Sequence, residues 1–325
     1  VSRLKEAKIE FVEYSGVKSN PIIEDADEAL ELVRKNNLQA VVAVGGGSVI
    51  DTAKFIVAAA LYPNKAWDLI EGSLVPQKAI PLFAVLTLAA TGTEMNNFAV
   101  IQSKEKGVKE SFVSPFIFPT ASFLDPSYTF SVSKDYTAYG LVDLCAHSLE
   151  AYFGKGESEL ADKIVCSIIK EAIEIGVNLL QNPNDYDLRA RMMYASTMAL
   201  NGTTVHGKKF GDWAVHGIGH VLSFEYNVPH GASLSVAYPA WLKLQSNRIG
   251  EKISKLGLSI FGITDVNQTI QRFEALFTIW GSPIRISQLN IANYNENRVF
   301  ELLKKSAVNG YCHEIHENDY LTLIN

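Results

Sequence analysis

Apolar runs that end at a glycine or a polar turn and lead into a helical pattern are the feature that most limits the fold of this chain. Residues 40–44 form a nearly continuous apolar run, which is followed by Gly45 and by a helical pattern over residues 49–61. Residues 82–88 form a second such run. Strands that are apolar along their length are typical of sheets covered on both faces, and alternating strands and helices form parallel sheets. The first 125 residues therefore predict an α/β domain.

The pattern changes after Pro126, because apolar residues recur at helical spacing from Ser133 onward and strand-like alternation nearly disappears. We expect two domains, an α/β domain of residues 1–130 and a helical domain of residues 131–325, which suits a length of 325 residues. The remaining elements that the patterns predict are a strand at 9–14, a helix at 25–37, a hairpin of 98–103 with 111–117, and helices at 134–153, 160–181, 186–200, 212–224, 230–244, 247–261, 267–280 and 297–309.

Charge and composition exclude several classes of partner. The chain has 29 Lys and Arg against 35 Asp and Glu, a net charge of −6, which argues against nucleic acid as the main partner. No apolar run approaches the roughly 20 residues of a membrane-spanning helix, so no membrane partner is expected. Three widely spaced cysteines, Cys145, Cys166 and Cys312, indicate neither a disulfide framework nor a thiolate zinc site, which fits a cytoplasmic location.

A glycine-rich turn follows the first buried strand. It consists of Gly45, Gly46, Gly47 and Ser48, and Asp51 follows on the next helix. Glycines allow a ligand to approach the backbone, and the helix that follows offers free N–H groups and its positive dipole end to phosphate. The turn therefore predicts a pyrophosphate cradle, with a simple helix-starting turn as the alternative. It matches neither GxGxxG nor the Walker pattern.

A second polar turn, which includes Thr87 and Thr91, follows the next buried strand. Turns after neighbouring strands of a parallel sheet lie at the same carboxyl edge, so both turns can face one ligand. The alternative is that the threonines cap the helix that follows.

Five side chains in the second half are candidates for a metal site. Asp143 and His147 are four residues apart in a predicted helix, so they share a face, and His216 and His220 have the same spacing. His230 lies at a turn a short distance further on. One carboxylate with several imidazoles suits Fe(II), Zn or another divalent first-row ion. These residues predict a metal site, but the pattern leaves open which four of the five bind.

These motifs in this order, with Leu124-Asp125-Pro126 and Gly140-Leu141-Val142-Asp143, resemble the iron-containing, group III alcohol dehydrogenases over nearly the whole chain. Within that family the chain most resembles the branch of NADPH-dependent butanol dehydrogenases and broad-range aldehyde reductases. The resemblance implies a Rossmann-like N-terminal dinucleotide-binding domain with a parallel sheet, an all-α C-terminal metal-binding domain, and one divalent metal between them.

The resemblance also assigns individual residues. It implies that Asp143, His147, His216 and His230 bind the metal, which leaves His220 near the substrate. His220 is our candidate for proton delivery, with an ordered water as the alternative. Around the cofactor, which is NADP or NAD, it adds five residues to the glycine turn and Asp51: Asn20, Thr87, Thr91, Lys109 and Leu124.

The implied reaction is hydride transfer between NAD(P)(H) and a primary alcohol or aldehyde, such as butanol or butanal. Fe(II) is the expected metal, with Zn or Ni as alternatives. A glycerol dehydrogenase or a dehydroquinate-synthase-like enzyme has the same fold, but the latter needs more basic residues than Lys109, Lys208 and Lys209. A non-catalytic relative is the third possibility, and it would bind metal without nucleotide.

The chain departs from the family at both ends. The family's first strand–helix unit, with a further nucleotide-contacting turn, is absent before Val1, and the family continues into a final helix where this chain stops at Asn325. We therefore expect a fragment of a longer protein. The preference for NAD or NADP is left open, because such enzymes tend to distinguish them at the missing turn. A homodimer is expected, because an unpaired sheet edge needs cover.

Overall fold

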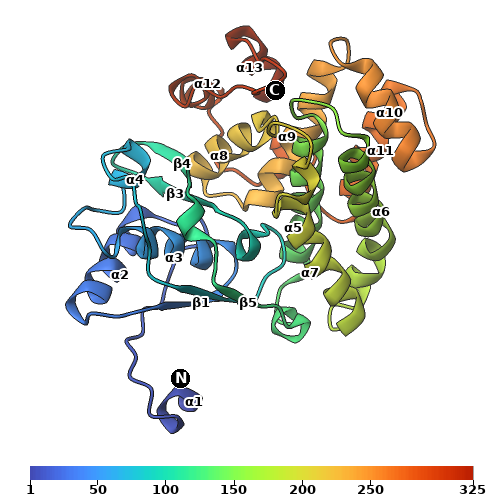
Figure 1. The fold of residues 1–325 in the computed structure, drawn as a ribbon. Coiled ribbons are helices and arrows are strands. Elements are labelled where there is room, and N and C mark those ends of the chain that lie inside the picture. The colour runs from blue at the N-terminus through green and yellow to red at the C-terminus, as the bar shows by residue number, and fades with distance from the viewer. Residues whose placement is uncertain (325) are drawn as a thin grey trace.

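The computed structural model describes residues 1–324, in which a parallel sheet and its helices form the N-terminal part and helices form the rest (Figure 1). The sheet contains β1 (Val41–Gly45), β2 (Leu82–Leu86) and β5 (Ala121–Phe123), in the order β1-β2-β5. Both pairs of strands are parallel, and Gly45 lies opposite Leu86. The predicted Rossmann-like sheet is therefore confirmed.

Helices cover one face of this sheet. α3 (Gly47–Ala59) packs on β1 and β2, and α2 (Ile23–Lys35) packs on α3 (Figure 1). Side chains alternate between the faces of a strand, so Ala43 is 3% exposed whereas Val42 and Val44 are 59% and 60% exposed. The expectation that both faces are covered is therefore wrong for the described residues.

A hairpin lies against α3. It consists of β3 (Phe98–Ser103) and β4 (Val108–Val113), which pair antiparallel and place Lys109 opposite Gln102. The second strand begins and ends earlier than the predicted 111–117, because Pro115 lacks the N–H that a paired strand needs. The short 3-10 helix η2 (Pro115–Ile117) takes its place.

The strand predicted at residues 9–14 is wrong. α1 (Ser2–Glu6) is followed by an extended stretch, and the first bridge after it joins Ile22 to Gln102. A strand needs a neighbour for its N–H and C=O groups, and apolar alternation cannot show that one exists. The Tyr14 hydroxyl instead donates to Asp25 at 3.3 Å.

The helical part is built around α5 (Lys134–Tyr152), which packs against α6 (Glu159–Gln181), α7 (Tyr186–Leu200) and α9 (His230–Gln245). Serine or aspartate side chains cap the start of several helices, as Ser133 does for α5. All the predicted helices form, with bounds shifted by up to four residues. The other helices are α4 (Asp68–Glu71), α8 (Ala214–Tyr226), α10 (Gly250–Phe261), α11 (Val266–Ile279), α12 (Glu296–Lys305) and α13 (Glu317–Ile324), with 3-10 helices η1 (Thr93–Met95), η3 (Pro126–Thr129), η4 (Thr203–Val205) and η5 (Ile286–Gln288).

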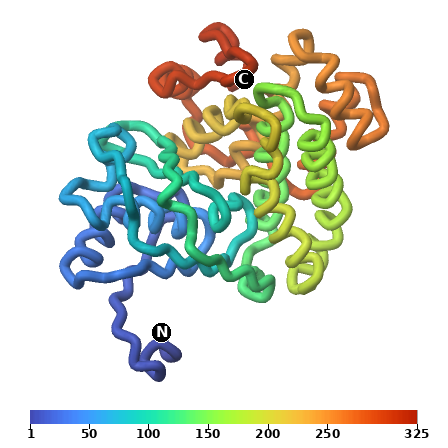
Figure 2. Tube along the Cα trace, viewed as in Figure 1, coloured from blue at the N-terminus to red at the C-terminus, as the bar shows by residue number. Residues whose placement is uncertain are grey.

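The last helix, α13, was not predicted. It is short, and its buried Tyr320 and Leu323 help it pack on α9 and α12, so tertiary contact rather than a long helical period defines it. No described helix is both long and apolar enough to cross a membrane. The α/β part and the helical part lie side by side (Figure 2). The domain boundary at residue 130 stays a prediction.

Candidate metal centre and nucleotide-binding turns

The two polar turns meet at the carboxyl edge of the sheet. The Thr87 N–H donates to the Gly45 carbonyl at 3.0 Å. A Cβ on Gly47 would lie 2.8 Å from Thr91 Oγ1, and one on Gly46 would lie 3.1 Å from Leu88 Cβ. The turns approach this closely because neither position carries a side chain. The shared edge expected from the sequence is therefore present.

The start of α3 fits an anionic group. Gly46 precedes the helix, and no side chain of its N-cap residue hydrogen-bonds to the first turn in the described chain. The first N–H groups of a helix have no partner within it, and the helix dipole favours negative charge there. The Ser48 hydroxyl donates to the Ser19 carbonyl at 2.6 Å, which holds the loop before Asn20 beside this turn.

Asp51 and Lys54 hold the second turn against α3. The Asp51 carboxylate accepts from Thr93 Oγ1 at 2.5 Å and from the Val100 N–H at 2.9 Å. The fully buried Lys54 ammonium donates to Thr93 Oγ1 at 2.8 Å and to the Phe98 carbonyl at 2.7 Å, and it also donates to both oxygens of Asn96. Burial lowers the pKa of Lys54 to about 8. A direct contact between Asp51 and a nucleotide stays a prediction.

Asn20 connects the two parts of the molecule. Lys109 Nζ donates to Asn20 Oδ1 at 3.1 Å, and Asn20 Nδ2 donates to Asn227 Oδ1 at 2.9 Å. Asn227 ends α8 in the left-handed conformation, three residues before His230. Burial lowers the pKa of Lys109 to about 8, although Asp51 and Asp143 oppose this effect. The predicted cofactor residues Asn20 and Lys109 therefore lie where the α/β part meets the metal candidates.

Leu124, directly after β5, lines a hollow of about 250 Å³ at the same end of the sheet. Glu94 contributes a buried carboxylate to this hollow, and Thr197 Oγ1 donates to its Oε1 at 2.5 Å. Burial raises the pKa of Glu94. The other lining residues are Met95, Phe118, Pro119, Ser122 and Thr197.

Three imidazoles surround the Asp143 carboxylate. Asp143 Oδ1 lies 3.6 Å from His147 Nδ1, 3.8 Å from His216 Nε2 and 3.7 Å from His230 Nε2. Asp143 and His147 come from α5, His216 comes from α8, and His230 begins α9. These distances are too long for hydrogen bonds. They suit atoms that share one ion, since two ligands about 2.1 Å from the same metal lie roughly 3 to 4 Å apart.

The unpartnered atoms at this cluster also fit a metal. Asp143 Oδ1, His147 Nδ1 and His216 Nε2 are buried without a hydrogen-bond partner among residues 1–324. Leaving such atoms unpaired is costly, and buried charges are normally paired or bind a metal. Although burial opposes it, His147 and His230 hold the pKa of Asp143 well below its usual range, so its carboxylate stays charged.

The structure separates the five sequence candidates. The possible ligand atoms of Asp143, His216 and His230 all lie within 4.8 Å of one another. His147 is not in that group, although its ring stacks on His216 with centroids 4.6 Å apart. The His220 ring lies 5.6 Å from the His230 ring and 6.5 Å from the His216 ring, at the border of the cluster. The assignment of four ligands, with His220 left over, stays a prediction.

Two buried carboxylates behind the cluster were missed from the sequence. Glu150 is 1% exposed, and its Oε1 lies 2.9 Å from His216 Nδ1. Asp212 is fully buried and accepts from the N–H groups of Cys312 and His313, each at 2.9 Å. Burial and the charge of Glu150 raise the pKa of Asp212 to about 7. The spacing of Glu150 was a usable signal, because it lies seven residues after Asp143 and shares its helix face.

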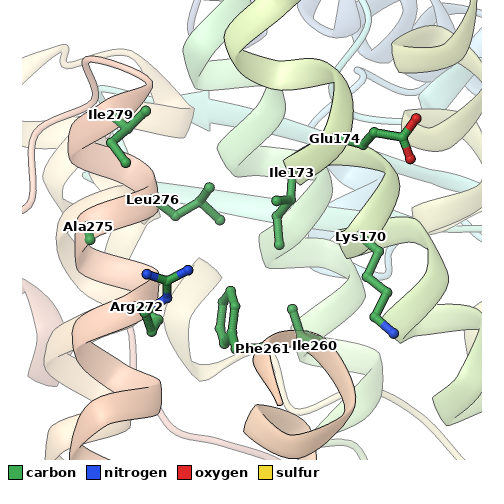
Figure 3. A pocket seen from close by; sticks show the side chains of 9 residues that line it. All are labelled: Lys170, Ile173, Glu174, Ile260, Phe261, Arg272, Ala275, Leu276 and Ile279. Carbon is green, nitrogen blue, oxygen red and sulfur yellow. The ribbon is translucent and has the colours of Figure 1, made fainter. Parts of the chain in front are cut away.

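Lys208 and the larger hollow of the helical part lie outside the candidate site. Lys208 Nζ contacts Asp162 at 2.5 Å and donates to the Ala151 and Tyr152 carbonyls, so its charge is already compensated by these groups. A larger hollow of about 320 Å³ lies among α6, α10 and α11, where Arg272 lies over Phe261 (Figure 3). None of its lining residues belongs to the turns or to the metal cluster: Lys170, Ile173, Glu174, Ile260, Phe261, Arg272, Ala275, Leu276 and Ile279.

Comparison with known families matches both parts of the chain. Residues 1–126 match the family described as iron-containing alcohol dehydrogenase, and residues 137–321 match the C-terminal part of the Fe-containing alcohol dehydrogenase family. The chain therefore belongs to the iron-containing alcohol dehydrogenase family. This result confirms the predicted family and fold class, and the predicted enzyme class of metal-containing oxidoreductases.

Individual relatives cover nearly the whole chain. A probable NADH-dependent butanol dehydrogenase of Bacillus subtilis is 32% identical, over 100% of this chain and 86% of the relative. An NADPH-dependent aldehyde reductase of Escherichia coli is 33% identical, over 97% and 83%. The crystal structure of an NADH-dependent butanol dehydrogenase A from Thermotoga maritima superposes with a TM-score of 0.94 at 34% identity, over 99% and 85%. The names of these relatives thus include NADH-dependent and NADPH-dependent enzymes.

Proposed function

We propose that this chain catalyses reversible hydride transfer between NAD(P)(H) and a primary alcohol or its aldehyde, such as butanol and butanal. The observation that carries the proposal is the cluster of Asp143, His216 and His230, whose possible ligand atoms lie within 4.8 Å of one another and in which Asp143 Oδ1 and His216 Nε2 lack partners among the described residues. It lies beside the Asn20–Lys109 contact of the α/β part. The names of the relatives, which are butanol dehydrogenases and an aldehyde reductase, support the same reaction.

Four residues would hold the metal in this proposal, namely Asp143, His147, His216 and His230. Fe(II) is the expected ion, with Zn or Ni as alternatives, because a carboxylate with imidazoles accepts all three. When bound, a divalent ion would act as a Lewis acid and polarise a carbonyl oxygen of the substrate. Residues 131–325 would form the domain that positions these ligands.

The N-terminal part, residues 1–130, would hold the nucleotide. When bound, the nicotinamide ring of the nucleotide would donate a hydride to the carbonyl carbon in reduction and accept one in oxidation. The first N–H groups of α3 suit the pyrophosphate, and Lys109 suits ribose or phosphate oxygens. The residues proposed to contact the nucleotide are Asn20, Gly45, Gly46, Gly47, Ser48, Asp51, Thr87, Thr91, Lys109 and Leu124.

Reduction of an aldehyde also consumes one proton at the carbonyl oxygen, and His220 is the proposed donor. Its half-buried ring lies beside those of His216 and His230, so it can reach the reaction centre without acting as a ligand. The Trp213 ring packs edge-on against the His216 ring, with centroids 5.2 Å apart, and its centroid lies 6.3 Å from that of Phe98, so aromatic side chains would line this side of the site.

The experiment that tests this function is reconstitution of the protein with Fe(II) or Zn(II), followed by titration with NADH and NADPH and by measurement of butanal consumption. We expect saturable nucleotide binding and turnover that requires the metal, and the nucleotide bound more tightly identifies the cofactor. Metal binding without nucleotide binding or turnover would contradict the proposal and indicate a non-catalytic relative.

Lys109→Met is expected to weaken nucleotide binding by about tenfold to a hundredfold, because a hydrogen bond to a charged group contributes roughly 1.5–3 kcal/mol. Since its pKa is lowered to about 8, Lys109 loses its charge as the pH rises through 8. Nucleotide affinity of the unmodified protein should therefore fall between pH 7 and pH 9. Fluorescence titration with NADPH or NADH at each pH measures both effects.

The arginine variant is the decisive comparison for Lys109. Lys109→Arg keeps the positive charge at all these pH values, so its nucleotide affinity should vary less with pH. Lys104→Met removes an exposed lysine of the same hairpin and should bind nucleotide as the unmodified protein does. An unchanged pH dependence in Lys109→Met would rule out this role.

We further propose a homodimer that works in the cytoplasm. The uncovered face of the sheet, with Val42, Val44 and Phe123 at 59%, 60% and 55% exposure, supports association with a second copy. The three cysteines are free, which suits a reducing compartment.

A further inference from the structure

The side chain of Glu150, which belongs to α5, contacts the start of α8. Its carboxylate accepts three hydrogen bonds: from the Trp213 N–H at 2.6 Å to Oε2, and from the His216 N–H at 3.1 Å and His216 Nδ1 at 2.9 Å to Oε1. All three donors belong to the segment that begins α8, whereas Glu150 belongs to the helix that carries Asp143 and His147.

The backbone contacts make Glu150 the cap of α8. Trp213, the residue before α8, has a left-handed backbone and no capping side-chain bond in the described chain. The N–H groups of the first helical turn need an acceptor, and a negative charge is favourable at that end of a helix. The carboxylate of Glu150, from α5, provides both the acceptor and the negative charge. The first turn of α8, which contains His216, is therefore anchored directly to α5.

The ring contact determines which nitrogen of His216 faces Asp143. Because Nδ1 contacts Glu150, Nε2 is the nitrogen that lies 3.8 Å from Asp143 Oδ1, and it has no partner among residues 1–324. A histidine ligand commonly donates its other ring N–H to a carboxylate, which orients the ring and makes it a stronger ligand. The pair of Glu150 and His216 has this arrangement.

We propose that Glu150 is a positioning residue for the metal centre: it aims Nε2 of His216 at the ion and keeps the ligands of α5 and α8 in register. The inference rests on the proposed metal site. It assigns Glu150 no contact with the metal, the nucleotide or the substrate. The residue acts through His216 and through the first turn of α8.

The test compares the metal affinity of Glu150→Gln with that of the unmodified protein. Glutamine has nearly the same size, but its amide nitrogen cannot accept a hydrogen bond. Either the Trp213 N–H or the two donors of His216 therefore lose their acceptor. We expect Zn(II) affinity, measured by competition with a chromophoric chelator, to fall by about 10- to 100-fold. The visible spectrum of the Co(II)-loaded variant should also change, because it reports the arrangement of the ligands.

Two further variants make the test specific. Glu150→Asp keeps a carboxylate and should recover part of the lost Zn(II) affinity, and it serves as the readout if Glu150→Gln does not fold. Ser148→Ala is the matched control, because Ser148 is fully buried on the same helix and its hydroxyl donates only to Leu144 in the described structure. Its Zn(II) affinity and Co(II) spectrum should not change.

The outcomes separate this inference from the proposed function. Unchanged Zn(II) affinity and an unchanged Co(II) spectrum in Glu150→Gln, with only a lower melting temperature of the metal-free protein, would show that Glu150 is merely structural and would overturn the inference. If the unmodified protein itself binds neither Zn(II) nor Co(II), the metal centre is wrong, and the inference fails with it.

Discussion

His230→Ala is expected to abolish stable metal binding and to lower butanal turnover by about a thousandfold or more. His230 Nε2 lies 3.7 Å from Asp143 Oδ1 and belongs to the three residues whose ligand atoms gather within 4.8 Å. Loss of a Lewis acid removes several kcal/mol of transition-state stabilisation, and each 1.36 kcal/mol is a factor of ten in rate. Metal content by atomic emission after dialysis, together with butanal turnover, measures the effect.

His220→Ala provides the contrast that separates a ligand from a proton donor. We expect this variant to keep its full metal content and to lose about 100- to 10,000-fold in turnover, the usual contribution of a general acid. Ser235→Ala is the control. Ser235 lies on the same helix as His230, and its hydroxyl donates a hydrogen bond to the Ala232 carbonyl, so this variant should keep both metal and activity. Full metal content in His230→Ala, or metal loss in His220→Ala, would contradict the assignment.

Lys54→Met is expected to lower the free energy of unfolding by about 3 to 5 kcal/mol, the usual effect of removing one partner from a buried charged group. The substitution removes one donor from each of four oxygens of residues 93, 96 and 98, and it removes the cation whose charge most opposes the raised pKa of Asp51. Methionine fills much of the same space, so the loss of polar contacts dominates the effect. Urea unfolding followed by circular dichroism gives the change in midpoint.

The structure predicts a further effect of the Lys54 variant on the nucleotide. Because Lys54 and Asp51 together hold the turn that carries Thr91, folded Lys54→Met should also bind NADH or NADPH more weakly. Lys35→Met, at the exposed end of α2, is the control and should unfold within about 0.5 kcal/mol of the unmodified protein. A similar small change in Lys54→Met would show that the buried ammonium contributes little to stability.

The elements that the sequence predicted well are those whose signal lies within one segment. β1 and β2 are short apolar runs bounded by glycine or polar turns, and α7 has the bounds expected from its helical period. The parallel order of two such strands also predicted that the two polar turns would share one edge, because adjacent parallel strands end at the same edge, and Gly47 and Thr91 lie close together there. The residues at 9–14 show the limit, since alternation alone cannot provide a pairing neighbour.

The candidate site was predictable in composition but not in arrangement. The sequence alone indicated Asp143, His147, His216, His220 and His230 as five possible ligands, because spacing within a helix shows which residues share a face. It could not show that three of them converge more closely than the others, because α5, α8 and α9 are brought together by packing. Helical spacing could place Glu150 on the same face as Asp143, but its interaction with His216 spans 66 positions, so no local pattern reveals that partner.

By itself, the sequence determined the two-part architecture, the edge where the polar turns lie, and the set of side chains able to bind a metal. Periodicity and spacing within each element carry that information. Only the tertiary structure decided that Asp51 and Lys54 hold a loop, that Val42 and Val44 stay exposed, and that Glu150 caps α8. Each of these results depends on which distant segment lies beside the residue, and packing of the whole chain determines that.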